Sequence, residues 1–377
     1  MEKQVNPFVV SGYAGPEYFC NRKAEREELI ARVVNGNNVT LTSIRRMGKT
    51  GLIEHCFRDR RLAKNYYTFF VDIYSTRSLR DFVFMLSKDI LLNIKPLGKR
   101  AWEEFLKTMR SIRPGISFDA SGTPIFTLQL GEISHPQTTL DEIFSYLGKA
   151  DRPCIVAVDE FQQVSLFPEK NMEALLRTHV QQCNNARFIF AGSQMHTMAN
   201  MFVSASRPFY QSTSMLHLYP IPLDEYIRFA RRHFSRGGKE ITPEAIEEIW
   251  HRFEGVTWYL QKILNQLYAS TLPGKRCGPA MIEPTVKNIV DSYQYSYSET
   301  LFRLPDKQKE LLVAIAKEGK AQALTSGQFI TKYSLRSASS IQAALKGLLE
   351  KDFITRTPEG EYGIYDFFFA IWLRESY

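Results

Sequence analysis

The first 220 residues alternate between short apolar runs and longer amphipathic segments. The short runs are rich in β-branched and aromatic residues, as buried strands are, and they lie at 39–42, 66–75, 154–158, 186–193 and 216–221. The amphipathic segments carry apolar residues at helical spacing and lie at 19–36, 79–94, 140–147 and 171–183. Strands that alternate with helices predict a parallel sheet covered on both faces.

The pattern changes after residue 221. From there to about residue 300 the apolar residues recur at helical spacing, so we expect successive helices and no strands. Beyond that point three predicted helices precede a predicted β-hairpin, which is the order of a winged helix-turn-helix domain. A second hairpin, around a Ser-Gly-Thr-Pro turn, is predicted as an insertion beside the main sheet. The predicted domains are a core at 1–220 with the inserted hairpin at 114–132, a helical lid at 221–300 and a winged helix at 301–377.

The segment VTLTSIRRMGKTG, residues 39–51, joins an apolar run to a helical pattern through a tight loop. In a triphosphate site the backbone N–H groups of such a loop wrap the phosphates, and the helix N-terminus adds partial positive charge. Lys49 is placed to reach the β- and γ-phosphate oxygens, and the Thr50 hydroxyl to take one position on Mg²⁺. Ser43 stands where the pattern G-x-x-x-x-G-K-[ST] has its first glycine. The alternative interpretation is a chance Gly-Lys-Thr triplet at an ordinary helix start.

Three arginines are candidates for contact with phosphate. Arg45 and Arg46 lie within the loop, where they can face the phosphates or a neighbouring subunit. Arg207, in the stretch SASRPFYQSTS, is a candidate for stabilising a transferred phosphate from a neighbouring subunit. For Arg207 we favour a solvated surface charge.

Acidic and polar residues follow two of the apolar runs. Asp159 is expected to lie beside the phosphate loop and hold a water of the Mg²⁺ shell, and Glu160 to orient and deprotonate the attacking water. Ser193 and Gln194 follow the next run and are expected to face the γ-phosphate, if that strand separates the other two. The alternatives are acids that cap the following helix, and a turn or helix cap at 193–194.

Composition and charge limit the remaining classes of protein. Charged residues at 23% and hydrophobic residues at 44% are ordinary for a soluble globular chain, and no apolar run reaches the roughly 18 to 20 residues of a membrane span. The first residues lack the apolar segment of a secretory signal, so we expect a cytoplasmic protein. The five cysteines are scattered and form no C-x-x-C, which predicts reduced, mostly buried thiols rather than a disulfide frame or zinc site. A net charge of +8 permits an acidic partner such as nucleic acid.

Together these motifs resemble the archaeal-type P-loop ATPases related to AAA+ and STAND proteins, in a form common in Bacteroidetes. The resemblance covers nearly the whole chain through NPF at 6–8, FCNRKAE at 19–25, SIRRMGKT at 43–50, VDEFQ at 158–162, GSQMHTM at 192–198, RPFYQSTSMLHLYPI at 207–221, GVTWYLQ at 255–261 and IYDFFFAIWL at 364–373. It implies an α/β P-loop NTPase fold of the ASCE/AAA+ type, with a helical lid and a C-terminal winged helix.

The resemblance also implies where ATP or ADP lies. The arm near Phe8 and the turn from Phe19 to Arg22 are implied to lie by the adenine, and the segment from Gly255 to Tyr259 to bring the lid over the nucleotide. The residues expected at the nucleotide are Phe8, Phe19, Arg22, Ser43, Arg45, Arg46, Met47, Gly48, Lys49, Thr50, Gly51 and Trp258. Thr50 and Asp159 are expected at Mg²⁺, and Glu160, Lys49 and Ser193 are expected to act in hydrolysis.

The chain departs from the family pattern at several positions. Asn21 replaces a usual glycine, and Gln211 and Ser212 stand where relatives carry Gly-Arg. Trp258 occupies the region where some AAA+ lids place a phosphate-sensing arginine. The change at 211–212 removes a plausible arginine trigger, and Trp258 weakens phosphate sensing, so we expect slow hydrolysis.

The leading hypothesis is a slow, switch-like ATPase in which the nucleotide state sets the arrangement of the winged helix. The alternatives are a nucleotide-stabilised DNA-binding regulator with little turnover, and a scaffold whose winged helix binds another protein. Residues 301–377 hold eleven lysines and arginines against nine acids, which is weak support for DNA binding. Oligomer formation is compatible with the sequence and is not specified by it.

Overall fold

The structure is a computed structural model that describes residues 6–94, 105, 107–111, 115–118, 124–127, 133–357 and 359–377. The chain forms two compact units. The first, here the sheet unit, comprises residues 1–229 and 254–262, and the second, here the helical unit, comprises residues 230–253 and 263–377. The predicted division into three domains stays a prediction.

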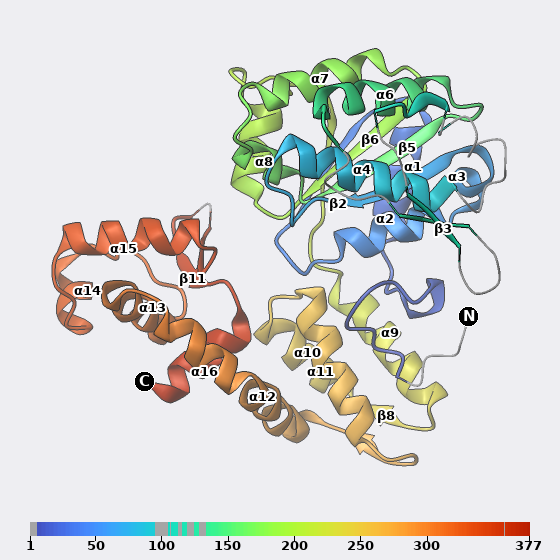
Figure 1. The fold of residues 1–377 in the computed structure, drawn as a ribbon. Coiled ribbons are helices and arrows are strands. Elements are labelled where there is room, and N and C mark those ends of the chain that lie inside the picture. Colours follow the sequence, from blue (N-terminus) through green and yellow to red (C-terminus); the bar gives the residue numbers. More distant parts are fainter. Residues whose placement is uncertain are drawn as a thin grey trace. The chain divides into compact units, whose positions relative to one another are not determined.

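The sheet unit is built on five parallel strands in the order β2-β5-β6-β1-β7. They are β1 (Val39–Thr42), β2 (Tyr67–Asp72), β5 (Cys154–Asp159), β6 (Ala186–Gly192) and β7 (Ser214–His217). All five predicted strands are present, and helices enclose them (Figure 1). The last strand is shorter than predicted, because Pro220 and Pro222 have no N–H for a ladder hydrogen bond.

Strand order decides where the candidate site lies. β6 pairs with β1 on one side and with β5 on the other, so it separates the strand before the phosphate loop from the strand that ends in Asp159. The register aligns Thr42 with Gly192, and Val158 with Phe190. The carboxyl ends of the three strands therefore meet at one edge of the sheet, as predicted.

The longer predicted helices of the sheet unit are present in the structure. They are α1 (Lys23–Val34), α2 (Lys49–Phe57), α3 (Arg60–Asn65), α4 (Leu79–Ile94), α6 (Pro136–Lys149), α7 (Met172–Gln182) and α8 (Met195–Val203). The core forms where apolar faces of α4, α6, α7 and α8 pack with β2, β5 and β6. The short helices α3 and α8 were not predicted, since six or nine residues carry too little periodicity.

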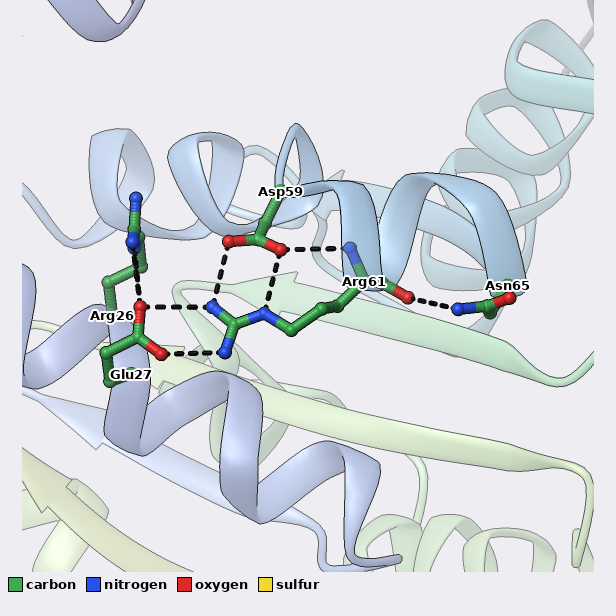
Figure 2. Close-up of polar contacts among 5 residues, drawn as sticks. All are labelled: Arg26, Glu27, Asp59, Arg61 and Asn65. Carbon is green, nitrogen blue, oxygen red and sulfur yellow. Dashed lines mark hydrogen bonds and ion pairs between the residues drawn. The ribbon is translucent and has the colours of Figure 1, made fainter.

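Helix α3 depends on polar contacts that Figure 2 shows. The Asp59 carboxylate caps it by accepting from the backbone N–H of Arg61 at 2.9 Å. The Arg61 guanidinium donates to Asp59 Oδ1 at 2.9 Å and to Glu27 Oε2 on α1 at 2.7 Å. Hydrogen bonds from Arg61 hold the pKa of Glu27, and that of Asp59, down to about 2. These contacts connect α1 with α3, which directly follows α2 in the chain.

The predicted inserted hairpin is present as two antiparallel strands, β3 (Gly115–Phe118) and β4 (Pro124–Thr127). Residues 119–123, which carry the predicted turn, lie outside the described residues. All five cysteines are free and buried, so the predicted burial of the thiols is confirmed. None of the helices in the described ranges has the length and apolar character that a membrane crossing requires.

The C-terminal part of the chain is mostly helical. Its helices are α9 (Leu223–Arg236), α10 (Pro243–Arg252), α11 (Thr257–Ser270), α12 (Ile282–Phe302), α13 (Asp306–Glu318), α14 (Gly327–Lys332), α15 (Ala338–Glu350) and α16 (Phe367–Ser376). The prediction that residues 222–300 contain no strand is wrong, because β8 (Glu240–Ile241) and β9 (Arg276–Cys277) form a parallel pair. Each has two residues, too few for an alternating pattern.

A winged helix closes the chain, as predicted. Helices α13, α14 and α15 precede the antiparallel strands β10 (Ile354–Arg356) and β11 (Tyr362–Ile364). The side chains of Ser326 and Ser337 cap α14 and α15 by accepting backbone N–H hydrogen bonds. Apolar residues buried along α13 and α15 give this segment its core.

The glycine that ends β6 has no room for a side chain. A Cβ atom on Gly192 would lie 2.5 Å from Gln162 Oε1 and 2.5 Å from Met198 Sδ, and both neighbours are buried. We expect Gly192→Ala to lower the free energy of unfolding, measured by urea denaturation, by about 1–3 kcal/mol.

A matched control is Gly148→Ala on α6, where an added Cβ meets nothing within 4 Å. It is expected to leave stability unchanged or to raise it by up to about 1 kcal/mol. Equal effects of the two substitutions would show that the packing around Gly192 is not as described.

Candidate functional site

A cavity of about 370 Å³ opens in the sheet unit at the carboxyl edge of the sheet. Five parts of the chain line it: the N-terminal arm, the phosphate loop with the start of α2, the end of β5, Ile221 after β7, and the segment that begins α11. Of the residues expected at the nucleotide, the cavity is lined by Phe19, Arg22, Arg45, Arg46, Met47, Gly48, Lys49, Thr50, Gly51 and Trp258.

The phosphate loop ends where α2 begins. Gly48 has a φ of 96°, a left-handed conformation that favours glycine, and Lys49 is the first helical residue. The Lys49 ammonium is buried and donates to Ser43 Oγ at 3.1 Å. Burial lowers the pKa of Lys49, while the nearby carboxylates of Asp159 and Glu160 raise it. Ser43 does not line the cavity, and its hydroxyl accepts the hydrogen bond from Lys49.

A hydroxyl and a carboxylate meet beside this loop. Thr50 Oγ1 donates a hydrogen bond of 2.6 Å to Asp159 Oδ2, and both residues line the cavity. Burial raises the pKa of Asp159, and the hydrogen bond from Thr50 lowers it. Carboxylate and hydroxyl oxygens are the donors that Mg²⁺ takes in proteins, so these two residues fit that ion.

Glu160 is held by two side chains. Ser193 Oγ, after β6, donates to Glu160 Oε2 at 2.8 Å, and Gln162 Nε2 donates to the same oxygen. The backbone of Glu160 is left-handed, with a φ of 56°. Ser193 therefore faces the carboxylate that was predicted as the base. Gln194 occupies the N-cap position of α8, and neither Ser193 nor Gln194 lines the cavity.

The two loop arginines contact aromatic rings. Arg45 lies over the ring of Tyr74, 5.5 Å from its centroid. Arg46 lies over Trp258 at 4.2 Å and donates to the Tyr259 hydroxyl at 2.7 Å. The backbone N–H of Trp258 also donates to the carbonyl of Arg46, at 3.1 Å. The start of α11 is thus fastened to the phosphate loop.

The turn before α1 supports the other side of the loop. Arg22 is buried and donates to the carbonyl oxygens of Met47 at 3.2 Å and Tyr219 at 2.6 Å. The ring of Phe19 stacks on His55 at 4.5 Å, and its edge packs against Gly51. Phe8 does not line the cavity; it is fully buried and packs edge-on against Phe229.

Arg207 lies apart from the cavity and forms an ion pair with Glu173 on α7. It is half-buried, so the expectation of a solvated charge is wrong in detail. The guanidinium of Arg207 is therefore already paired with the Glu173 carboxylate.

Sequence reasoning missed part of the cavity wall. Tyr13 and Glu54 line it, as does Gln261 on α11. Burial raises the pKa of Glu54, which lies one helical turn beyond Thr50. That i to i+4 spacing could have indicated Glu54 from the sequence, because residues four apart share a helix face.

Comparison with known proteins bears on the fold. A family model described as "Probable winged helix domain" matches residues 295–375. No curated protein matches the chain in sequence. Among solved structures, the Walker-type ATPase of Pyrococcus abyssi superimposes with a TM-score of 0.67 at 20% identity, covering 98% of this chain and 99% of that one. The chain has the same fold as that ATPase.

Two further structures, both from Aeropyrum pernix, have the same fold. The ORC2 protein, solved as ADPNP–ADP complexes, has a TM-score of 0.60 at 16% identity and covers 98% of this chain and 95% of its own. The ORC1 protein, solved in complex with DNA, has a TM-score of 0.54 at 12% identity, with coverages of 99% and 96%. The implied fold, a parallel α/β sheet followed by helices and a C-terminal winged helix, is confirmed.

Proposed function

We propose that this protein binds ATP in the cavity of the sheet unit and hydrolyses it slowly, as a switch. The observation that carries the proposal is the 2.6 Å contact between Thr50 at the start of α2 and Asp159 at the end of β5. Two strands, separated by β6, bring these groups together at a helix N-terminus that favours phosphate. An ordinary helix start does not need a buried acid from a distant strand.

The bound state follows from the residues present. Loop N–H groups and Lys49 would hold the phosphates. Thr50 and Asp159 would hold Mg²⁺, which would neutralise charge on the phosphate oxygens. The ring of Phe19, which stacks on His55, lines the cavity, where a base can pack against it.

Slow hydrolysis is supported by the contacts of Glu160. Its carboxylate already accepts hydrogen bonds from Ser193 and Gln162, and these must rearrange before it can bind a water. Arg207 is engaged by Glu173. Triggering would then require a partner or subunit that supplies positive charge, which is how transferred phosphate is stabilised in other phosphoryl-transfer proteins.

The second candidate is a nucleotide-stabilised DNA-binding regulator, which the similarity to the ORC1 protein solved with DNA favours. The charge of the winged helix speaks against it. Helix α15, in the position of a recognition helix, carries one lysine, Lys346, and this lies 3.9 Å from Glu350. Phosphate contacts supply most non-specific affinity for DNA, so a protein partner for the winged helix fits better.

Removing the loop lysine tests nucleotide binding. Lys49→Ala deletes a charge-assisted phosphate contact and is expected to weaken ATP binding by a few kcal/mol, on the order of 100-fold in Kd. Titration calorimetry with MgATP measures this, and Lys64→Ala on the exposed face of α3 is the control. Unchanged affinity in the Lys49 variant would rule out the site.

Removing the base tests hydrolysis separately. Glu160→Gln keeps the shape of the side chain and removes its basicity, so ATP binding should survive while single-turnover hydrolysis falls by roughly 100-fold or more. The exposed Glu310 on α13, changed to Gln, serves as the control. Hydrolysis by the Glu160 variant at the parent rate would show that another group activates water.

A further inference from the structure

Arginines gather on the exposed face of α9. Positions 228, 231, 232, 235 and 236 have the spacing of one helix face, all are exposed, and all but Ser235 are arginine. Arg228 lies in the sheet unit and pairs with Asp224 and Glu225. The arginines of this face that belong to the helical unit are Arg231, Arg232 and Arg236.

A second basic segment lies beside the C-terminal end of α9. Strand β8 begins at Glu240, soon after α9 ends, and pairs in parallel with β9, where Arg276 lies. The backbone N–H of Gly274 donates to the Gly238 carbonyl at 2.7 Å, and that of Glu240 donates to the Lys275 carbonyl at 3.0 Å. The exposed side chains of Lys275 and Arg276 are therefore neighbours of the end of α9.

Arg231 also belongs to this region. The carboxylate of Glu244, on the first turn of α10, lies within electrostatic reach of both Arg276 and Arg231. We call the five exposed cations the basic surface: Arg231, Arg232, Arg236, Lys275 and Arg276. The carboxylates placed among them are that of Glu244 and that of Glu240, which lies 3.4 Å from Arg276 Nε. Cations therefore predominate here, whereas residues 301–377 carry eleven cations against nine acids.

Folding does not require this accumulation of like charge. Cations in the last turn of a helix interact favourably with its dipole, which accounts for Arg236 on α9. That effect does not extend to Lys275 and Arg276, which come from a different segment. Exposed ion pairs add little to stability, and like charges held close together repel one another. An anionic partner would offset that repulsion.

The side chains around the basic surface indicate the class of the anion. Residues 230–277 are all described by the structure, and Leu272 is the one large apolar residue among them that is exposed. A protein interface has a core that is depleted of charge, and a membrane-binding helix needs an exposed apolar face. Interfaces with nucleic acid are more polar and much more positively charged. The basic surface has that composition.

We infer that the basic surface of the helical unit binds the phosphate backbone of nucleic acid. Guanidinium groups suit this partner, because each can donate two parallel hydrogen bonds to one phosphate. Contacts to phosphate carry no base information, so binding is expected to be independent of sequence and strongly dependent on salt. The inference goes beyond the proposed nucleotide site and does not depend on it. It also assigns nucleic acid to a surface other than the winged helix.

The test is fluorescence anisotropy of the full chain with a labelled DNA duplex of about 30 base pairs, without nucleotide, between about 50 and 200 mM salt. Three to five phosphate contacts predict that log K falls with log salt at a slope of about −2.7 to −4.5. Replacing Arg231 and Lys275 together by Gln removes two contacts. The slope should then become less steep by about 1.8, and Kd at 0.1 M salt should rise about 10- to 100-fold.

The matched control replaces Arg336 and Lys346 together by Gln, which removes the same charge from exposed positions of the winged helix. It should keep the parent slope. Weaker binding by the control, with parent binding by the Arg231 and Lys275 variant, would overturn the inference and assign DNA to the winged helix. Equal weakening by both variants would also overturn it, because only net charge would then matter.

Sedimentation with phosphatidylcholine vesicles that contain about 30% phosphatidylserine tests the lipid alternative. The parent chain is expected to bind the duplex and not to sediment with the vesicles. Binding to the vesicles and not to the duplex overturns the inference, as does failure to bind either. Both results leave the proposed function standing, since MgATP titration of the same chain measures the nucleotide site separately.

Discussion

The hydrogen bond between Thr50 and Asp159 joins the two elements on which the site depends. Thr50 follows β1 and Asp159 ends β5, and one strand lies between them. Neighbouring strands are about 4.8 Å apart, so the two strands are separated by about 10 Å. The loop after β1 carries Thr50, on the first turn of α2, toward the end of β5, and the parallel register of β1, β6 and β5 brings the strand ends to one edge of the sheet. The same register places Ser193, after β6, between them.

Around the cavity, several residues adopt left-handed backbone conformations that residues other than glycine rarely take. Arg22, Arg46 and Glu160 all have positive φ, near 60°, at a typical cost of about 1–3 kcal/mol each. Each side chain is held by specific partners: Arg22 by loop carbonyls, Arg46 by the aromatic rings of α11, and Glu160 by Ser193 and Gln162. Of the ten non-glycine residues with positive φ in the part of the chain that the structure describes, these three line the cavity. Such placement is typical of functional sites.

Much of this arrangement could be predicted from the sequence, for identifiable reasons. The strands of the sheet are mostly apolar and give a clear pattern, and Lys49, Thr50 and Asp159 belong to motifs with fixed spacing. Strands β8 and β9 could not be predicted, because two residues are too few to show the alternation of apolar and polar residues. Ser43 in place of glycine proved compatible because its hydroxyl donates to the Ile44 carbonyl and accepts from Lys49. Asn21 replaces a family glycine at a φ of 48°, and asparagine is among the few residues that tolerate this region.

The central claim is that the nucleotide acts as a switch, and a ligand shifts an equilibrium only through contacts that differ between two states. The γ-phosphate would make such contacts with Lys49 and Ser193, and through Arg46 with the start of α11. Hydrogen exchange on the full chain, compared between a non-hydrolysable ATP analogue and ADP, tests this most directly. We expect different protection in residues 250–262 and in the helix at 337–350. Identical exchange in both states, with both ligands shown to be bound, would contradict the switch and leave a static nucleotide-stabilised scaffold.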